Sequence, residues 1–211
     1  DIDLDPRENI KNKKNIKVLL KKIVESDSQN LQKSINNAYH KDAKLKCFHP
    51  INNISGTKDI NDKLWLPLKN SFPDLERRDS LIVGGSFQDK VFVSIVSLLT
   101  GTYKQAWLGI PVNNKTIHLR ICEVHQIKDE KIVESHILID VVDFIRQAGF
   151  WPLNKSNGAE GLWASPITGD GTTFENLDKK LSISSLEQAL TMQRSLNIKP
   201  ERDANADQNY V

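Results

Sequence analysis

The chain has 211 residues, of which 38% are hydrophobic and 27% are charged, and its net charge at pH 7 is +2. These values are typical of one ordinary globular domain with a sizeable core and room for an added arm. The small net charge excludes the broad positive field used to bind nucleic-acid backbones, and no run approaches the roughly 20 apolar residues of a membrane span, so we expect neither partner.

The first predicted helix, residues 9–25, has apolar side chains at helical spacing along one face. Six lysines crowd the same segment: Lys11, Lys13, Lys14, Lys17, Lys21 and Lys22. This basic face is either simply solvated or contacts an anionic partner. We interpret residues 1–27 as an N-terminal basic helical extension.

Two more helices and a short strand are predicted next. The second helix begins at Ser28, and the strand follows at residues 43–48. The third helical pattern covers residues 57–73, with Thr57 as its N-cap and Pro67 as a break or kink near its end.

Four extended runs rich in Val, Ile, Leu and Thr come after the helices: residues 75–87, 91–103, 116–127 and 131–142. Short connections between long strands predict antiparallel neighbours. Helices followed by a strand meander predict a segregated α+β fold. A strongly bent sheet with helices on one face would enclose a cone with an open mouth, and a pocket there would be apolar with few polar groups.

The composition changes after residue 153, so we treat residues 154–211 as a further segment. It starts with a stretch rich in Gly, Ser, Pro and Asn, continues with a predicted helix at residues 182–196, and ends in a polar tail that we expect to be frayed. The helix needs a surface that buries Leu186, Leu190 and Leu196, which either its own domain or a second protomer provides.

Cys47 and Cys122 are the only two cysteines, and both lie in apolar stretches. Because they do not form a metal-ligand set, buried reduced thiols are a better interpretation than a disulfide or a metal pair. They favour a reducing compartment, so we expect a cytoplasmic protein.

The chain contains a series of short segments in this order: Gly56, residues 71–74 (SFPD), 99–103 (LTGTY), 107–111 (WLGIP), 131–136 (KIVESH), Asp140 and residues 147–149 (QAG). Their order and spacing resemble the motifs of the SnoaL-like polyketide cyclases, in the fold group of nuclear transport factor 2 and ketosteroid isomerase. The resemblance covers about residues 31–149. It implies a SnoaL-like domain at residues 28–153, with a cone-shaped curved antiparallel sheet and N-terminal helices packed on its concave face.

Three positions depart from the family pattern. Glu130 stands where many members have a turn glycine, residues 112–114 (VNN) replace the usual PTG, and His136 stands where members often have Trp. The last change alters the shape and polarity of the pocket, so the resemblance does not identify a substrate.

The resemblance implies cofactor-free acid/base chemistry. In the cyclases, the Asp after the closing motif moves the proton during intramolecular aldol ring closure, and Asp140 occupies that position. A carboxylate in a dry pocket can accept a carbon-bound proton, so neither a metal nor a cofactor is expected. The implied ligand is small and apolar or aromatic-polyketide-like.

Side-chain alternation along the last predicted strand decides which neighbours share a face with Asp140. One face holds Asp140, Leu138, His136, Glu134 and Ile132. The other face, which packs under the helices or in a dimer interface, holds Ile139, Ile137, Ser135 and Val133. His136 either helps Asp140 in acid/base work or is a structural histidine.

In the preceding strand, one of two sets of side chains faces the interior: either His118, Arg120 and Cys122, or Glu123 and His125. His125 is the second acid/base candidate, or it lies at a solvated strand end. Arg120 either pairs across the strands with Glu134 or Glu123, or binds substrate. Glu123 is a further substrate-binding candidate.

Trp65, Tyr103 and Trp107 form either an aromatic wall for a planar substrate or plain core. His49 either lines the mouth of the pocket and binds substrate or caps its loop.

Three functions remain open. A cyclase or isomerase needs Asp140 and a histidine within hydrogen-bond reach in a dry cavity. A non-catalytic small-molecule-binding or dimeric interaction module of the same fold fits an Asp140 that is paired with arginine or exposed to water. An epoxide hydrolase or dehydratase needs a further charged set beside the base. We also expect a homodimer that covers the outer face of the sheet.

Overall fold

The computed structural model describes residues 5–151, 153–154, 166, 168–174 and 178–196. The chain forms two units, one ending at Phe174 and one that contains helix α6 (Lys179–Leu196). The helix predicted at residues 182–196 is confirmed, whereas the expected frayed tail lies outside the described residues. No helix in the described ranges has the length and apolar character that crossing a membrane requires.

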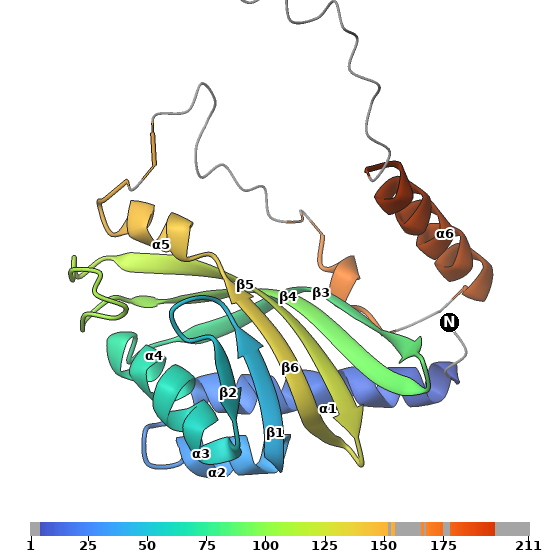
Figure 1. Cartoon of the computed structure of the whole chain (residues 1–211), viewed down its shortest axis with the longest axis horizontal. Coiled ribbons are helices and arrows are strands. Elements are labelled where there is room, and N and C mark those ends of the chain that lie inside the picture. Colours follow the sequence, from blue (N-terminus) through green and yellow to red (C-terminus); the bar gives the residue numbers. More distant parts are fainter. Residues whose placement is uncertain (1–4, 152, 155–165, 167, 175–177, 197–211) are drawn as a thin grey trace, which may run out of the picture. The chain divides into compact units, whose positions relative to one another are not determined.

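A six-stranded curved sheet forms the centre of the first unit (Figure 1). Its strands are β1 (Tyr39–Cys47), β2 (Asn53–Ser55), β3 (Glu76–Phe87), β4 (Lys90–Thr102), β5 (Thr116–Lys128) and β6 (Lys131–Ile139). Their order across the sheet is β2-β1-β6-β5-β4-β3. Neighbours are antiparallel, as predicted for the four long strands, except that β1 and β6 run parallel.

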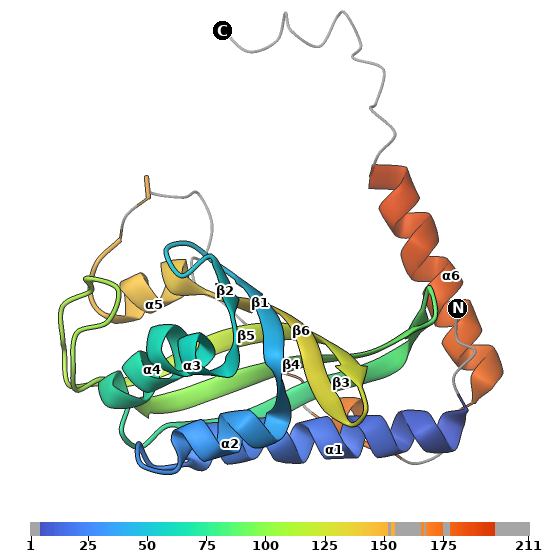
Figure 2. The same ribbon diagram turned by 60° about the horizontal axis from the view of Figure 1, so that its bottom comes forward.

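Most helices pack on one face of this sheet (Figures 1 and 2). They are α1 (Pro6–Glu25), α2 (Leu31–Ala38), and a continuous run of α3 (Thr57–Ile60), the π-helix η1 (Asn61–Trp65) and α4 (Leu66–Ser71). Helix α5 (Val141–Gln147) follows β6, and the short 3-10 helix η2 (Asp170–Thr172) packs against β3. The predicted α+β fold with helices on the concave face is therefore confirmed.

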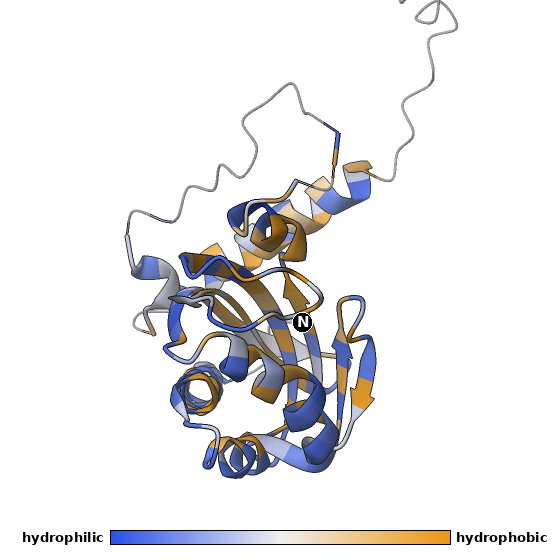
Figure 3. Cartoon of the chain, turned by 90° about the vertical axis from the view of Figure 1, so that its left-hand side faces the viewer, coloured by the Kyte–Doolittle hydropathy of each residue, from blue (hydrophilic) through white to orange (hydrophobic). Residues whose placement is uncertain are grey.

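The core lies between the sheet and these helices. Every second residue of β4 from Val93 to Gly101 is buried, as is every second residue of β5 from Ile117 to Ile127. The strands in the middle of the sheet are accordingly coloured mainly hydrophobic in Figure 3. The opposite face, called the outer face below, exposes large apolar side chains of its own: Leu81, Val83, Phe87 and Leu138.

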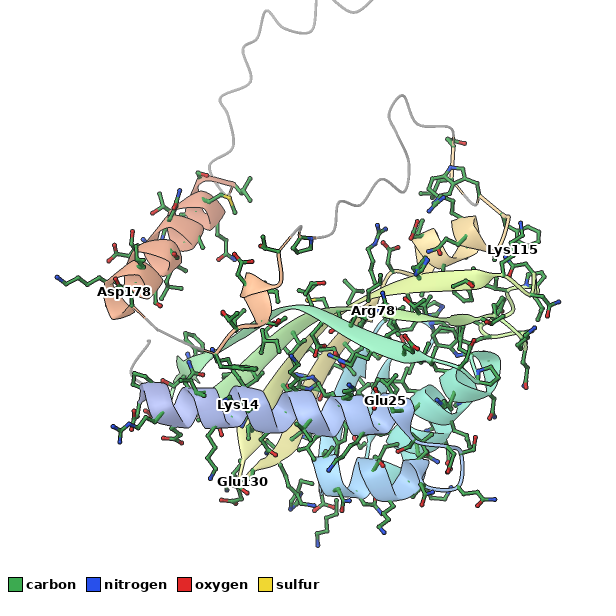
Figure 4. All side chains as sticks on the ribbon, turned by 180° about the vertical axis from the view of Figure 1, so that it is seen from behind. Lys14, Glu25, Arg78, Lys115, Glu130 and Asp178 are labelled. Carbon is green, nitrogen blue, oxygen red and sulfur yellow. The ribbon has the colours of Figure 1, made fainter. Side chains whose placement is uncertain are left out.

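Helix α1 is part of this core rather than an extension of it. Ile16, Leu20 and Ile23 are fully buried, and the helix packs against β3. Figure 4 shows α1 lying across the back of the domain, with Lys14 and Glu25 marking its course. The region that we interpreted as a separate segment, residues 1–27, therefore contributes one of the walls of the domain.

The third helical segment contains a π-helical turn just before Pro67, close to the break or kink predicted at that residue. Proline lacks the N–H of a normal helical turn, and its ring crowds the preceding turn. The wider π-helical turn immediately before α4 accommodates this defect, so the run continues to Ser71. Gly56, not Thr57, occupies the N-cap, because its φ of +83° favours glycine.

The last strand is shorter than the predicted residues 131–142. It ends at Ile139, and Asp140 caps α5 by accepting a hydrogen bond from the Asp143 N–H at 2.9 Å. Val141 and Val142 favour strands by propensity. They begin a helix here because the cap satisfies the helix start and Phe144 is fully buried one turn later.

The predicted faces of β6 are correct near its end and wrong near its start. Ser135, Ile137 and Ile139 point into the core, but so does Ile132, which alternation placed on the other face. A register shift between β5 and β6 at Gln126 and Ile127 causes this, because one irregular residue reverses the alternation.

We predict that Leu20→Ala lowers the free energy of unfolding by about 2–5 kcal/mol, because Leu20 is fully buried and its truncation leaves a cavity in the core. The matched control is Val18→Ala on the same helix, where the side chain is 50% exposed. Its expected effect is within about 0.5 kcal/mol. Urea denaturation measures both, and equal losses would show that α1 does not belong to the core.

Candidate functional site

A groove of about 390 Å³ lies on the outer face, next to the start of α5. Apolar side chains make up most of its lining: Phe48, Val96, Leu98, Leu138, Val141 and Val142. Its polar groups come from His49, Ser80, Arg120, Cys122 and Asp140. An apolar cleft of this size with a few converging polar groups is typical of a site for a small organic molecule.

Strand register brings Arg120 and Asp140 together in this groove. Ile121 pairs with Ile139, so the residues next to them, Arg120 and Asp140, are adjacent across β5 and the end of β6. The Asp140 N–H donates to the Arg120 carbonyl at 3.0 Å. The Arg120 Nε donates to Asp140 Oδ2 at 3.1 Å, and its Nη2 contacts the same oxygen.

Both carboxylate oxygens of Asp140 therefore accept hydrogen bonds, Oδ1 from the helix start and Oδ2 from Arg120. Asp143 extends the network, since it lies 3.6 Å from Arg120 and accepts a hydrogen bond from Arg146 at 2.8 Å. The predicted pairing of Arg120 with Glu134 or Glu123 is wrong, because Arg120 pairs with Asp140 while Glu123 pairs with Arg77 and Glu134 with Lys46. The Asp140 side chain remains 34% exposed, so a ligand in the groove can still reach it.

His136 does not join Asp140, although both belong to the outer face. Its side chain is 53% exposed, and its Nε2 lies 2.9 Å from Glu134 Oε1. Glu134 also accepts a hydrogen bond from Lys46 at 2.7 Å, and these contacts lower its pKa. His136 is absent from the residues that line the groove within the described ranges. The expectation that His136 faces the same pocket as Asp140 is therefore wrong.

Glu123 and His125 point to the inner face, where they form a buried polar network with residues of three other strands. Glu123 Oε2 lies 2.5 Å from Arg77 Nη2, and the same nitrogen donates to Ser97 at 2.8 Å. Asp79 accepts hydrogen bonds from Arg77 Nε and from the Ser97 hydroxyl, both at 2.7 Å. The Arg77, Glu123 and His125 side chains are 0% exposed.

The network continues through His125 towards β1 and η1. His125 Nδ1 lies 2.7 Å from Ser135 Oγ. Burial lowers the pKa of His125 to about 4, so its imidazole is neutral at pH 7. Tyr39 is also fully buried beside Ser135 and Trp65, and burial raises the pKa of its hydroxyl well above the usual value. The Asp140 groove and this inner network thus lie on opposite faces of the sheet.

Tyr103 and Trp107 lie in the core and do not line the groove. Tyr103 stacks on Phe72 with ring centroids 5.0 Å apart, and Trp107 packs against Phe144 at 5.9 Å. The Tyr103 hydroxyl donates to the Ile110 carbonyl and accepts from the Trp107 N–H. Trp65 is buried as well, at 2% exposure. The three aromatic residues therefore belong to the core of this structure and do not form a wall of the groove. His49, by contrast, does line the groove.

Cys122 is exposed in the groove, which corrects the expectation that both thiols are buried, and both cysteines are free. Burial raises the pKa of the half-buried Cys47 thiol to about 12. The described part of the chain holds no group of three or more His, Cys, Asp or Glu residues placed to bind a metal.

Sequence reasoning missed Arg77 and Tyr39. The spacing of Arg77 and Asp79 was a usable signal, because two charges two residues apart in a strand share one face. Nothing in the local pattern showed that this face is the buried one. Tyr39 is both the C-cap of α2 and the first residue of β1.

Comparisons with known proteins agree with this fold. The family model for "SnoaL-like polyketide cyclase" matches residues 21–148. A comparison with curated proteins found no match.

Three solved structures illustrate the structural likeness. A proposed SnoaL-like polyketide cyclase from Jannaschia sp. CCS1 has 12% identity and a TM-score of 0.54, with 66% of this chain and 95% of that chain covered. AclR from Streptomyces galilaeus, a proposed hydroxylase, has 16% identity and a TM-score of 0.52, with 89% and 99% covered. IdmH from Streptomyces antibioticus, a proposed polyketide cyclase, has 16% identity and a TM-score of 0.52, with 64% and 99% covered. At these identities the likeness shows the fold alone.

We predict that His125→Gln weakens the dependence of stability on pH. The folded-state pKa of His125 lies below the unfolded value of about 6.5, so the unfolded chain binds the extra proton between these two values. Stability from this group is full above about pH 6.5 and falls, by on the order of 3 kcal/mol, as pH drops towards 4.

Urea unfolding of wild type and variant between about pH 7 and pH 4.5 measures the difference. His136→Gln, at a 53% exposed histidine outside the inner network, is the matched control for the substitution itself. An unchanged pH dependence in His125→Gln would contradict the role of the buried imidazole.

Proposed function

We propose that this chain, which belongs to the SnoaL-like polyketide cyclase family, binds a small apolar carbonyl compound in the outer-face groove and moves a proton next to its carbonyl group with Asp140. The observation that supports this most is the convergence of Asp140 and Arg120 on one apolar groove. Family membership supports the reaction class, aldol-type cyclisation or isomerisation. The substrate itself stays a prediction.

In the proposed reaction, the apolar side chains of the groove hold the carbon skeleton and exclude water from its reacting end. The Asp140 carboxylate accepts a proton from the carbon next to the carbonyl, which leaves an enolate. The positive guanidinium of Arg120 beside it stabilises the negative charge on the enolate oxygen. Asp140 then returns the proton to the product, so no net proton is consumed. This chemistry requires neither a metal nor a cofactor.

A second function has its own support, namely that of a non-catalytic small-molecule-binding module. Both oxygens of Asp140 already accept hydrogen bonds, and the carboxylate is paired with an arginine. A carboxylate held in this way can serve to shape and polarise the groove without exchanging a proton. The two functions predict the same ligand binding and differ only in proton transfer.

Hydrogen–deuterium exchange separates these two functions. With α-tetralone as an aryl ketone probe in D2O, wild-type protein should accelerate exchange of the hydrogens next to the carbonyl. Asp140→Asn should reduce this acceleration by about 100-fold or more, because a neutral amide cannot accept the proton. Asn also remains a good N-cap, so α5 should stay folded.

Asp129→Asn in the β5–β6 turn is the matched control and should keep wild-type exchange. Ligand-observed NMR measures binding of the same probe separately. Binding without exchange in the wild type would favour the binding module. Unchanged exchange in Asp140→Asn would exclude Asp140 as the base.

We also propose that two copies pair through the outer face, which exposes Val83 by 52% and Leu138 by 62%. A homodimer would cover these side chains and part of the groove. Light scattering should then show a dimer at micromolar concentration. Val83→Lys should shift it towards monomer, whereas Val18→Lys, at a similarly exposed site on α1, should not. A monomeric wild type would contradict this arrangement.

A further inference from the structure

The inner network contains a pair of buried polar atoms that face each other without touching. Glu123 Oε1 and His125 Nε2 are 3.7 Å apart, which is too long for a hydrogen bond. Neither atom has a hydrogen-bond partner among the described residues, and both side chains are 0% exposed.

The guanidinium of Arg77 adds a third such atom. Its Nη2 contacts Glu123 Oε2, and its Nε is bound to Asp79, but its Nη1 is buried without a hydrogen-bond partner in the described part of the chain. One connected group of side chains therefore presents an unmet acceptor on Glu123, an unmet donor on Arg77, and a His125 nitrogen that can play either role.

Leaving these groups unsatisfied is costly. A buried polar atom without a hydrogen bond costs about 1–3 kcal/mol, and more when the group is charged. Several such atoms in one network would offset a large part of the stability of an ordinary domain. Buried groups of this kind in folded proteins are normally satisfied by ordered internal water.

The hydrogen-bonding capacity of these three atoms determines which kind of molecule could bind among them. An anion would meet the carboxylate of Glu123, and a cation would meet the guanidinium of Arg77. The guest must therefore be neutral, must donate to Glu123, and must accept from Arg77 or His125. Water is the smallest molecule that does both, and a polar contact longer than 3.5 Å is where a bridging water is expected.

We propose that the inner network is a binding site for an internal water that bridges Glu123 Oε1 and His125 Nε2. The water completes a chain of hydrogen bonds and one ion pair that runs from Asp79 and Ser97 through Arg77 and Glu123 to His125 and Ser135. It thereby joins the inner faces of β3, β4, β5 and β6. This site is independent of the Asp140 groove, which lies on the other face of the sheet.

A high-resolution crystal structure of the full chain tests the proposal directly. We expect an isolated density peak at about 2.7–3.2 Å from both Glu123 Oε1 and His125 Nε2. A direct hydrogen bond between these two atoms, with no density peak between them, would overturn it.

Water–protein cross-relaxation NMR provides a second readout in solution. The His125 ring protons should show a cross-peak from a long-lived water in the wild type and in the exposed-site control His136→Leu. Glu123→Leu removes the acceptor, so the cross-peak should be lost if that variant folds. If Glu123→Leu does not fold, the wild-type spectrum decides, because absence of the cross-peak there contradicts the site.

Discussion

Strand β5 has different polar side chains on its two faces. Both the Asp140 groove and the inner network depend on that separation. Consecutive side chains of a strand point to opposite faces, so Glu123 and His125 lie under the helices while Arg120 and Cys122 lie on the outer face. The register with β6 then places Arg120 beside Asp140. A slip of one residue would bury Arg120 and expose Glu123, which would dismantle both sites at once.

The buried charges make such a slip energetically unfavourable. Moving Arg77 and Glu123 out of water carries a desolvation penalty that their attraction offsets only with good geometry and further hydrogen bonds. Asp79 and Ser97 provide those bonds from β3 and β4. Breaking the set would leave an uncompensated charge in the core. The stability of the domain comes instead from its apolar packing, including that of α1.

The two polar sites differ in access, and this difference bears on function. The Asp140 groove is open, mostly apolar and large enough for a small organic ligand. The inner network is closed around side chains with no exposed surface. Asp140 is positioned by the helix it caps and by Arg120, which fixes its direction but also occupies its oxygens. Proton transfer therefore depends on how a ligand approaches this ion pair, whereas binding requires only the groove.

The sequence by itself determined the four long strands, the helical segments, their order and the family, because periodicity and short motifs are local properties. It left two alternatives for Ile137 and Ile139, a place under the helices or in a dimer interface, and the structure shows that both residues belong to the core. Only the tertiary structure decided that β1 pairs with β6, that Asp140 begins a helix, and that Arg120 is its partner. Register between distant strands arises from contacts that no local pattern contains, and each site consists of residues joined by that register.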